Sequence, residues 1–235
     1  MFKYLLIFPF VTNISENIIS IKSQIPSSVK LVAVSKTRPV SDILTAYNSG
    51  QRRFGENRVQ EILEKKDLLP KDIEWHLIGH LQSNKVKYVV PFISMLQSVD
   101  SLKLLTAINS EASKIKRVID CLLQIHIAAE ETKFGFSMNE LEEVFEKKAF
   151  SELKSVRICG VMGMATFTTD LTRVKLEFSY LKDCYNTLKN RYFNADLQFN
   201  EISMGMSGDY ETAIEEGSTI IRIGSLIFGE RNQNT

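Results

Sequence analysis

Short apolar runs alternate along this chain with longer amphipathic stretches. The apolar runs are rich in β-branched and aromatic residues, which favours strands. They are Leu31–Ser35, Arg52–Phe54, Glu74–Ile78, Ser94–Ser98, Ile119–Ile127, Arg157–Met162, Phe199–Ser203 and Thr219–Ile223. Strands separated by helical stretches indicate βα units and a parallel sheet.

The longer stretches have the periodicity of amphipathic helices. They are Asn13–Gln24, Ser41–Asn48, Arg58–Lys66, Ser101–Lys116, Met138–Lys148 and Leu171–Arg191. Ser137 and Glu140 form a capping-box pattern at the start of one of them, and Pro39 suits the entrance of another. We therefore predict an α/β fold, a single (β/α)8 TIM barrel with an extra N-terminal helix. The strand count alone also fits a doubly wound open sheet.

Composition agrees with a soluble globular protein whose main domain spans residues 13–235. The chain has 235 residues, 44% of them hydrophobic and 24% charged, with a formal net charge of +1. This balance gives no broad field that would attract nucleic acid or a membrane, so we expect neither as a partner. Three scattered cysteines without a CxxC pair, together with only three histidines, argue against a metal site and suggest a reducing, cytoplasmic location.

Residues 1–12 form an apolar N-terminal extension. The run Phe2–Val11 contains Lys3 and Pro9 and is too short to span a bilayer. We interpret it as an extension or an upstream start, with a weak signal peptide as the alternative.

Polar and small residues gather where the predicted strands end. Lys36 follows the first strand, Gly55-Glu56-Asn57 the second, Gly79-His80 the third, and Gly224-Ser225 the eighth. In a barrel these carboxyl ends form one face, which is where active sites lie. The sequence therefore predicts a site at that face.

Lys36 is in phase with two valines. Strand alternation places Val32, Val34 and Lys36 on one face, toward the barrel interior near its mouth. Desolvation there would lower the pKa of the amine and prepare it for Schiff-base chemistry. The alternative is a lysine at a strand end whose ammonium group reaches water. Its position alone does not separate the two.

Two small-residue loops near the C-terminus favour phosphate binding. The segment 203–208 (SMGMSG) leads into a helix-like stretch, Asp209–Glu216, and Gly224-Ser225 supplies a second turn. Exposed backbone N–H groups in such loops bind anions without a basic side chain, and Ser207 and Ser225 add hydroxyl donors. TIM barrels often bind phosphate between these two loops. The plainer interpretation is tight turns that need glycine.

Arg222 lies within the apolar eighth strand, in phase with Gly224. A guanidinium inside a barrel is costly unless it is paired. It either forms a buried ion pair, with Glu201 for example, or donates to a ring nitrogen of a ligand. A lysine, a phosphate loop and a buried arginine together describe a site for pyridoxal 5′-phosphate (PLP).

Six segments carry a resemblance to a known family. They are AVSKTRP (33–39), FGENRVQE (54–61), WHLIGHLQSNK (75–85), QSVDS (97–101), GVMGMATF (160–167) and SMGMSGDYETAIEEGSTIIRIGSLIFGER (203–231). Residues 13–231 thereby resemble the pyridoxal phosphate homeostasis protein family, barrel-only relatives of the N-terminal domain of alanine racemase.

The resemblance implies a role for individual residues. Lys36 matches the lysine that forms the internal aldimine with PLP, and Arg222 matches the arginine facing the pyridine nitrogen. Asn57 would lie close to the ring, and Met204 and Met164 would line the pocket. The phosphate cradle would consist of Ser207, Gly208, Gly224 and Ser225. His80 fits either the mouth or the surface. His126 stands where many relatives carry asparagine, and we expect it to be an interior histidine rather than a ligand.

Function follows from the arginine and from the end of the chain. An arginine at the ring nitrogen keeps that nitrogen unprotonated and weakens the electron sink that a racemase needs. The sequence ends directly after the eighth unit, so we expect no second domain of the kind that supplies an acid/base tyrosine in racemases. We therefore expect a non-catalytic PLP carrier, a monomer that stores, buffers or delivers the cofactor, with transient contact to PLP-requiring apoenzymes. The alternatives are a racemase-like enzyme and a class I Schiff-base aldolase.

Overall fold

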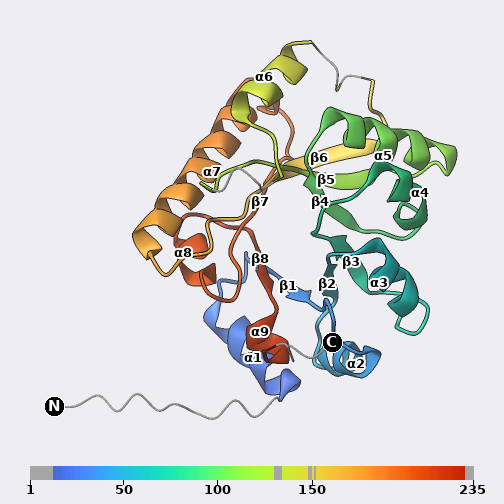
Figure 1. Ribbon diagram of the computed structural model, residues 1–235, viewed down its shortest axis with the longest axis vertical. Helices are drawn as coiled ribbons and strands as arrows, with labels where there is room; N and C mark the ends of the chain where they lie inside the picture. Colours follow the sequence, from blue (N-terminus) through green and yellow to red (C-terminus); the bar gives the residue numbers. More distant parts are fainter. Residues whose placement is uncertain (1–12, 130–133, 148–149, 151, 231–235) are drawn as a thin grey trace.

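Eight parallel strands close into a barrel in the order β1 to β8 (Figure 1). The computed structural model describes residues 13–129, 134–147, 150 and 152–230. The strands are β1 (Lys30–Val34), β2 (Arg53–Glu56), β3 (Glu74–Leu77), β4 (Met95–Val99), β5 (Ile119–Gln124), β6 (Val156–Met162), β7 (Glu201–Ser203) and β8 (Ile220–Ile223). Pairing of β1 with β8 closes the sheet, so the TIM-barrel prediction is confirmed and an open sheet is excluded.

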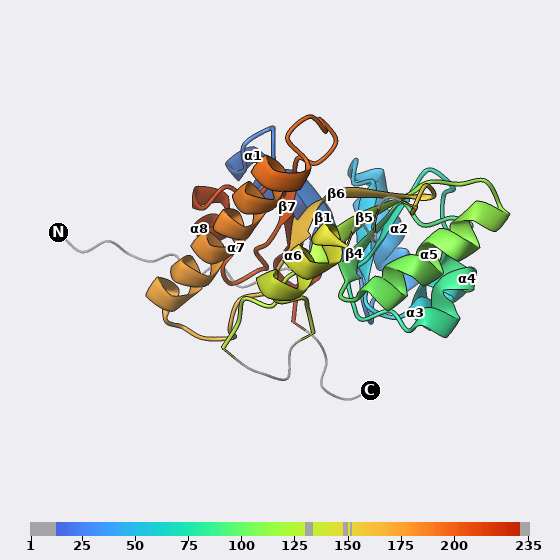
Figure 2. The same cartoon turned by 90° about the horizontal axis from the view of Figure 1, so that it is seen from above.

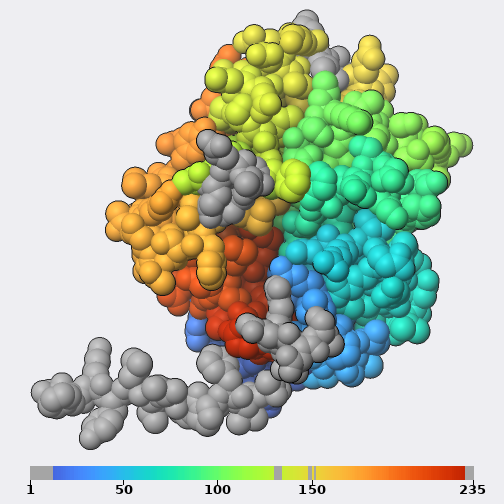
Figure 3. All heavy atoms as spheres, in the orientation of Figure 1, coloured from blue at the N-terminus to red at the C-terminus, as the bar shows by residue number. Residues whose placement is uncertain are grey.

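Helices form a ring around the strands (Figures 1 and 2). They are α1 (Ile14–Gln24), α2 (Val40–Asn48), α3 (Val59–Lys65), α4 (Val86–Val89), α5 (Leu102–Lys114), α6 (Met138–Glu146), α7 (Leu171–Tyr192), α8 (Tyr210–Glu215) and α9 (Ser225–Phe228), with a 3-10 turn η1 (Ser83–Lys85) before α4. In the space-filling view, the red residues near the C-terminus lie against the blue residues near the N-terminus (Figure 3).

The predicted N-terminal helix is confirmed and packs at the closure of the barrel. Asn13 caps α1 by accepting a hydrogen bond from the N–H of Glu16. The Asn17 side chain donates to the Ile227 carbonyl in α9 at 3.0 Å. The capping box of Ser137 and Glu140 is also present at the start of α6. The capping box could be predicted because its two residues lie three positions apart in the sequence.

Three segments differ from the sequence prediction. The fifth strand ends at Gln124 rather than Ile127, because the chain beyond it bonds to Phe136 instead of continuing the sheet: the Phe136 N–H donates to the Gln124 carbonyl and the His126 N–H to the Phe136 carbonyl. The short helices α4 and α9 were not predicted, since four residues are too few to show helical periodicity.

The buried apolar residues separate into two layers. A small cluster that includes Val32, Met162 and Ile220 fills the barrel interior, while a larger one that includes Leu31, Phe54 and Ile221 packs between the strands and the helices. Alternation along β1 and β8 places successive residues in different layers. Val32 and Arg222 are register partners on these two strands, so Arg222 belongs to the interior.

The N-terminal extension predicted for residues 1–12 lies outside the described residues. Within the part of the chain that the structure describes, no helix has the length and apolar character to cross a membrane. The same described residues contain no group of three or more His, Cys, Asp or Glu side chains arranged to hold a metal ion.

Candidate functional site

Lys36 lies in a turn at the carboxyl end of β1. The strand ends at Val34, and the Ser35 carbonyl accepts the N–H of Arg38 at 3.0 Å, so Lys36 and Thr37 are the central residues of the turn. Lys36 is half-buried. Val34 packs beside β8, since a Cβ added to Gly224 would lie 3.5 Å from the Val34 Cβ. The end of β1 that carries Lys36 is therefore adjacent to the end of β8.

The loops after β7 and β8 are tied together. The Gly224 N–H donates to the Ser207 hydroxyl at 3.2 Å. Within the first loop, the Met206 N–H donates to the Asp209 carboxylate at 2.5 Å. Burial raises the pKa of Asp209, opposed by this bond and by the charge of Arg222. The structure therefore brings together the two segments that were predicted to form a phosphate cradle.

Two glycines of the first loop have different local reasons. Gly205 has a φ of 95°, and a Cβ there would lie 2.6 Å from the Ala213 Cβ in α8, so it is required by backbone conformation and packing. Gly208 is exposed, and an added Cβ would meet no atom within 4 Å. Packing does not explain Gly208.

Arg222 is buried inside the barrel and bonds to neutral partners. Its Nη1 donates to the Ser203 hydroxyl at 2.6 Å and its Nη2 to the Gly163 carbonyl at 3.0 Å. Burial lowers its pKa to about 10, so the guanidinium is charged at neutral pH. The alternative of an ion pair with Glu201 is wrong, because Glu201 pairs with Lys30 and accepts a hydrogen bond from Thr219.

A hydrogen-bonded chain continues from Arg222 through the barrel interior. The Ser203 hydroxyl donates to Gln97 Oε1 at 2.7 Å, and Gln97 Nε2 lies 2.7 Å from His76 Nδ1. Arginine can only donate, which fixes the direction of every bond and requires an unprotonated Nδ1 on His76. Burial, with the charges of Arg53 and Lys30, lowers the pKa of His76 to about 3. The imidazole is therefore neutral and accepts the last hydrogen bond of this network.

The remaining predicted residues are placed less uniformly. Asn57 follows β2 at the carboxyl end and is half-buried. Ser225 begins α9. Met204 is fully buried in the layer between strands and helices, because Ser203 takes the inward position. The expectation that the Met204 side chain lines the pocket is therefore wrong.

His126 and His80 both lie beyond strand ends. His126 is half-buried and lines a small hollow together with Met164, so it is not the interior histidine that we expected. His80 is exposed; its Nδ1 lies 2.7 Å from Asp100 Oδ2, and its ring stacks on Phe134 with centroids 4.2 Å apart. Both are at the carboxyl end of the barrel.

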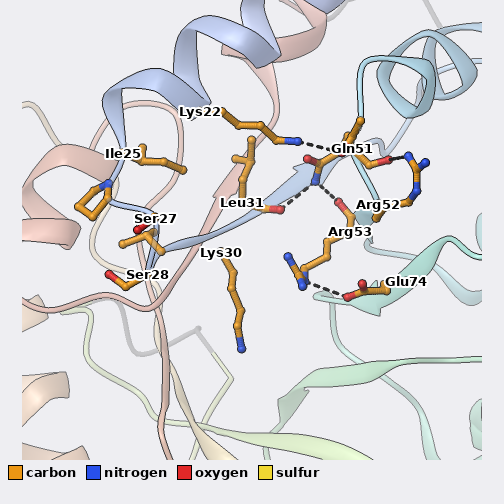
Figure 4. Close-up of a pocket in the computed structure, with 13 residues that line it drawn as sticks. Lys22, Ile25, Ser27, Ser28, Lys30, Leu31, Gln51, Arg52, Arg53 and Glu74 are labelled. Atoms are coloured by element: carbon orange, nitrogen blue, oxygen red, sulfur yellow. Dashed lines mark hydrogen bonds and ion pairs between the residues drawn. The ribbon is translucent and has the colours of Figure 1, made fainter.

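A cavity of about 480 Å³ lies at the opposite, amino-terminal end of the strands (Figure 4). It is lined by four cationic side chains, Lys22, Lys30, Arg52 and Arg53, and by one carboxylate, Glu74. Arg53 pairs with Glu74 at 2.8 Å and Arg52 with Asp72 at 3.1 Å. None of the predicted site residues lines this cavity.

Sequence reasoning missed the groups that support the site. Ser203, Gln97 and His76 hold Arg222, and a cluster beneath the Lys36 turn bonds to the neighbours of that lysine, Ser35 and Thr37. Strand phase could have found the first set, because each of the three occupies an inward position. The second set joins β2 to α3, so spacing along the chain reveals only its Glu61–Lys65 pair.

The residues present fit PLP. The Arg222 guanidinium, which bonds to a hydroxyl and a carbonyl, is a donor for the ring nitrogen, and the open backbone at Gly208 is a donor surface for a phosphate. The lysine amine comes from the adjacent strand end. The donor set therefore matches three different chemical groups of the cofactor.

Comparison with known proteins agrees with the fold and places the chain among relatives. The pyridoxal phosphate homeostasis protein of Aquifex aeolicus is 41% identical over 203 residues, which are 86% of this chain and 87% of that protein. PipY of Synechococcus elongatus PCC7942, solved with PLP bound, superposes with a TM-score of 0.84 at 36% identity and covers 92% of this chain and 100% of that one. An alanine racemase of Clostridium difficile 630 shares the fold, with a TM-score of 0.73 at 15% identity over 95% of this chain and 57% of the racemase.

The model of the alanine racemase N-terminal domain family matches residues 11–232. This span includes every described strand and every residue of the site above. On this match and on the identity to its relatives, the chain belongs to the alanine racemase N-terminal domain family.

Proposed function

We propose that this protein binds pyridoxal 5′-phosphate, holds it covalently as a Schiff base on Lys36, and serves vitamin B6 homeostasis by storing, buffering or delivering the cofactor. One observation carries the proposal. The turn of Lys36, the loops at Ser207 and Gly224, and the guanidinium of Arg222 come from the neighbouring strands β1, β7 and β8. PLP offers an aldehyde, a phosphate and a ring nitrogen, one group for each.

The comparisons support the same assignment. The relative from Aquifex aeolicus is named for PLP homeostasis, and PipY was solved with PLP bound. Both align with this chain over more than four fifths of its length. Because the identity exceeds one third in each case, we transfer the cofactor to this chain as part of the proposal.

The residues of the chain have separate tasks in this proposal. The amine of Lys36 attacks the aldehyde carbon, and one water leaves as the imine forms. Ser207, Gly208, Gly224 and Ser225 hold the phosphate through hydroxyl and backbone N–H groups. Asn57 lies beside the ring, and Arg222 donates to its nitrogen.

Arg222 favours a carrier over an enzyme. Its pKa of about 10 keeps it charged and hydrogen-donating at neutral pH, so it cannot protonate the ring nitrogen and the cofactor is left a weak electron sink. The hydrogen bonds that run from Arg222 through Ser203 and Gln97 to His76 leave the guanidinium little freedom to turn. We propose that amino-acid turnover is absent or residual.

Spectroscopy of the loaded protein tests the proposal. We expect a yellow band that Lys36→Ala abolishes, and borohydride reduction followed by peptide mapping should find the cofactor on Lys36. Lys71→Ala is the matched control, because Lys71 is exposed and contacts only Asp67 among the described residues. A wild-type protein that stays colourless and cannot be loaded would contradict the proposal and bring the aldolase alternative forward.

Delivery requires the linkage to Lys36 to exchange. We propose that a small amine or a lysine of a recipient apoenzyme displaces Lys36 by transimination, which returns the free Lys36 amine. Incubation with excess amino acid should shift the visible spectrum and reduce the borohydride-trapped Lys36 peptide. An unchanged adduct would count against this route, and product formation from the amino acid would favour a racemase-like enzyme.

Assembly and location are part of the proposal as well. We propose a cytoplasmic monomer that contacts PLP-requiring apoenzymes transiently. Sedimentation equilibrium of the loaded protein at micromolar concentration checks the monomer, and a stable dimer would contradict it.

A further inference from the structure

The turn that carries Lys36 contains a strained residue. Thr37 has a φ of 65°, in the left-handed region, and it occupies the third position of a turn closed by Ser35 and Arg38. Glycine is the residue that favours this conformation, and a β-branched side chain disfavours it. The surrounding structure must therefore hold the turn in place.

A charged cluster lies directly beneath this turn, outside the barrel. Glu56 is fully buried at the end of β2, and Lys65 is buried near the end of α3. Lys65 Nζ lies 2.8 Å from Glu56 Oε1 and 2.6 Å from Glu61 Oε1. We call Glu56, Glu61 and Lys65 the turn-support cluster.

The turn-support cluster contacts the residues on both sides of Lys36. On one side, the Ser35 hydroxyl donates to Glu56 Oε1 at 2.6 Å, and Lys65 donates to the Ser35 carbonyl at 2.9 Å. On the other side, the N–H of Thr37 donates to Glu61 Oε1. The Lys65 ammonium thus connects the carboxylates that bond to Ser35 and to Thr37, the two neighbours of Lys36.

This arrangement is expensive for packing alone. Two carboxylates share one ammonium in a layer of otherwise apolar residues, and burial raises the pKa of Glu56 against the effect of Lys65 and Ser35. Glu56 Oε2 is buried and, among the described residues, has no hydrogen-bond partner. Buried ion pairs add little to stability compared with apolar residues of the same volume, whereas they fix geometry when each is satisfied.

We propose that Glu56, Glu61 and Lys65 are positioning residues that fix the Lys36 turn from outside the barrel. They hold Thr37 in its left-handed conformation and direct the Lys36 amine toward the cofactor aldehyde. This inference rests on the proposed function, because it assumes that Lys36 is the attachment lysine.

Removal of one support tests the inference. We expect Glu61→Ala to slow covalent attachment of PLP to Lys36 by about tenfold, since small misplacements of a reacting group have effects of this size or larger. In the cofactor-free protein, the N–H of Arg38, which closes the turn, should exchange faster with solvent. Glu64→Ala is the matched control on the same helix, because Glu64 is exposed and, among the described residues, bonds only to Gln60.

A rescue separates positioning from a general loss of structure. Glycine adopts a positive φ without strain, so Thr37→Gly in the Glu61→Ala background should return the attachment rate to within about threefold of wild type. If Glu61→Ala attaches PLP at the wild-type rate with unchanged Arg38 exchange, the inference is overturned. It is also overturned if attachment slows and glycine does not restore it. A wild-type protein that never attaches PLP to Lys36 would instead overturn the proposed function.

Discussion

Arginines near the two ends of the barrel are balanced in different ways. At the amino-terminal end, Arg53 and Arg52 face Glu74 and Asp72, and Lys30 faces Glu201. At the carboxyl end, Arg222 bonds to a hydroxyl and a carbonyl; no ion pair of Arg222 is found among the described residues, and the Asp209 carboxylate acts on it through its charge.

The difference distinguishes structural charges from functional ones. A cation with its own carboxylate needs nothing further, and removing one partner mainly costs stability. A buried guanidinium held by neutral dipoles keeps its charge available for a ligand. The cavity of about 480 Å³ thus lies at the end of the barrel away from the predicted site.

Acidification should have the largest effect, because His76 lies in the interior between the two ends. Its pKa is about 3 in the folded protein against an ordinary 6.5. Between these pH values the unfolded chain binds a proton that the folded protein does not, so stability falls as pH falls. We expect the free energy of unfolding to drop by about 1.4 kcal/mol per pH unit in this window from His76 alone.

Chemical denaturation of wild type and His76→Gln at several pH values measures this contribution. Glutamine can accept from Gln97 but does not titrate, so the variant should be less stable at pH 7 and lose less stability on acidification. The titrating carboxylates are common to both proteins and cancel in the difference. If the free energy of unfolding changed with pH in parallel for the two proteins, His76 would not be the neutral acceptor of the hydrogen-bonded network.

Matched arginine substitutions compare the two ends directly. Arg222→Met removes a charged hydrogen bond and should weaken PLP binding by about 10- to 100-fold. Arg53→Met at the other end should leave PLP affinity unchanged and cost at most about 1 kcal/mol of stability, because Arg53 and Glu74 are both partly exposed. Fluorescence titration with PLP and denaturant unfolding give the two quantities. Equal losses of affinity would remove the distinction between the ends.

The sequence was sufficient for the barrel and for the residues in phase on its strands. Alternation placed Arg222 in the barrel interior correctly, because Arg222 follows a period of two along β8. The inward direction of Lys36, which lies in the turn beyond β1, stays a prediction. Alternation failed where the chain leaves the sheet, as at Gln124, since Ile125 and Ile127 continue the apolar run without continuing the strand. The family resemblance, and not alternation, placed Met204 at the pocket, whereas alternation from the inward Ser203 sends it outward.

The contacts of the turn-support cluster could not be predicted from the sequence for a different reason. The turn-support cluster joins the end of β1 to β2 and α3 through side chains, and Thr37 carries no composition signal for a positive φ. Such contacts depend on how elements pack. Only Glu61 and Lys65, which are four residues apart on one helix, form a pair that spacing predicts.

Gly208 provides a smaller and cleaner comparison within the carboxyl end. Alanine has room there and needs no positive φ, so Gly208→Ala should leave stability within about 0.5 kcal/mol of wild type, or raise it slightly. If a phosphate approaches the backbone at this position, PLP affinity should still fall by about tenfold. Gly205→Ala is the contrasting variant, which should lose stability by about 1–3 kcal/mol because its Cβ meets Ala213. Unchanged PLP affinity in Gly208→Ala would place the phosphate elsewhere.

The smallest expected effect concerns inorganic phosphate and the basic cavity. Phosphate should compete with PLP at the loops of Ser207 and Gly224, and slow covalent attachment to Lys36.

Lys22 lines the cavity at the other end, where its ammonium donates to the Gly50 carbonyl at 3.0 Å. Burial, and then the charges of Arg52 and Arg53, lower the pKa of Lys22. If charge balance there is structural, Lys22→Ala should leave the phosphate concentration for half-inhibition within about twofold of wild type, as expected for a residue far from the competing site. A rate assay over a phosphate series at constant ionic strength measures it. Should Lys22→Ala weaken the inhibition instead, the cavity itself would bind the anion, and cations with partners of their own could no longer be set aside as structural.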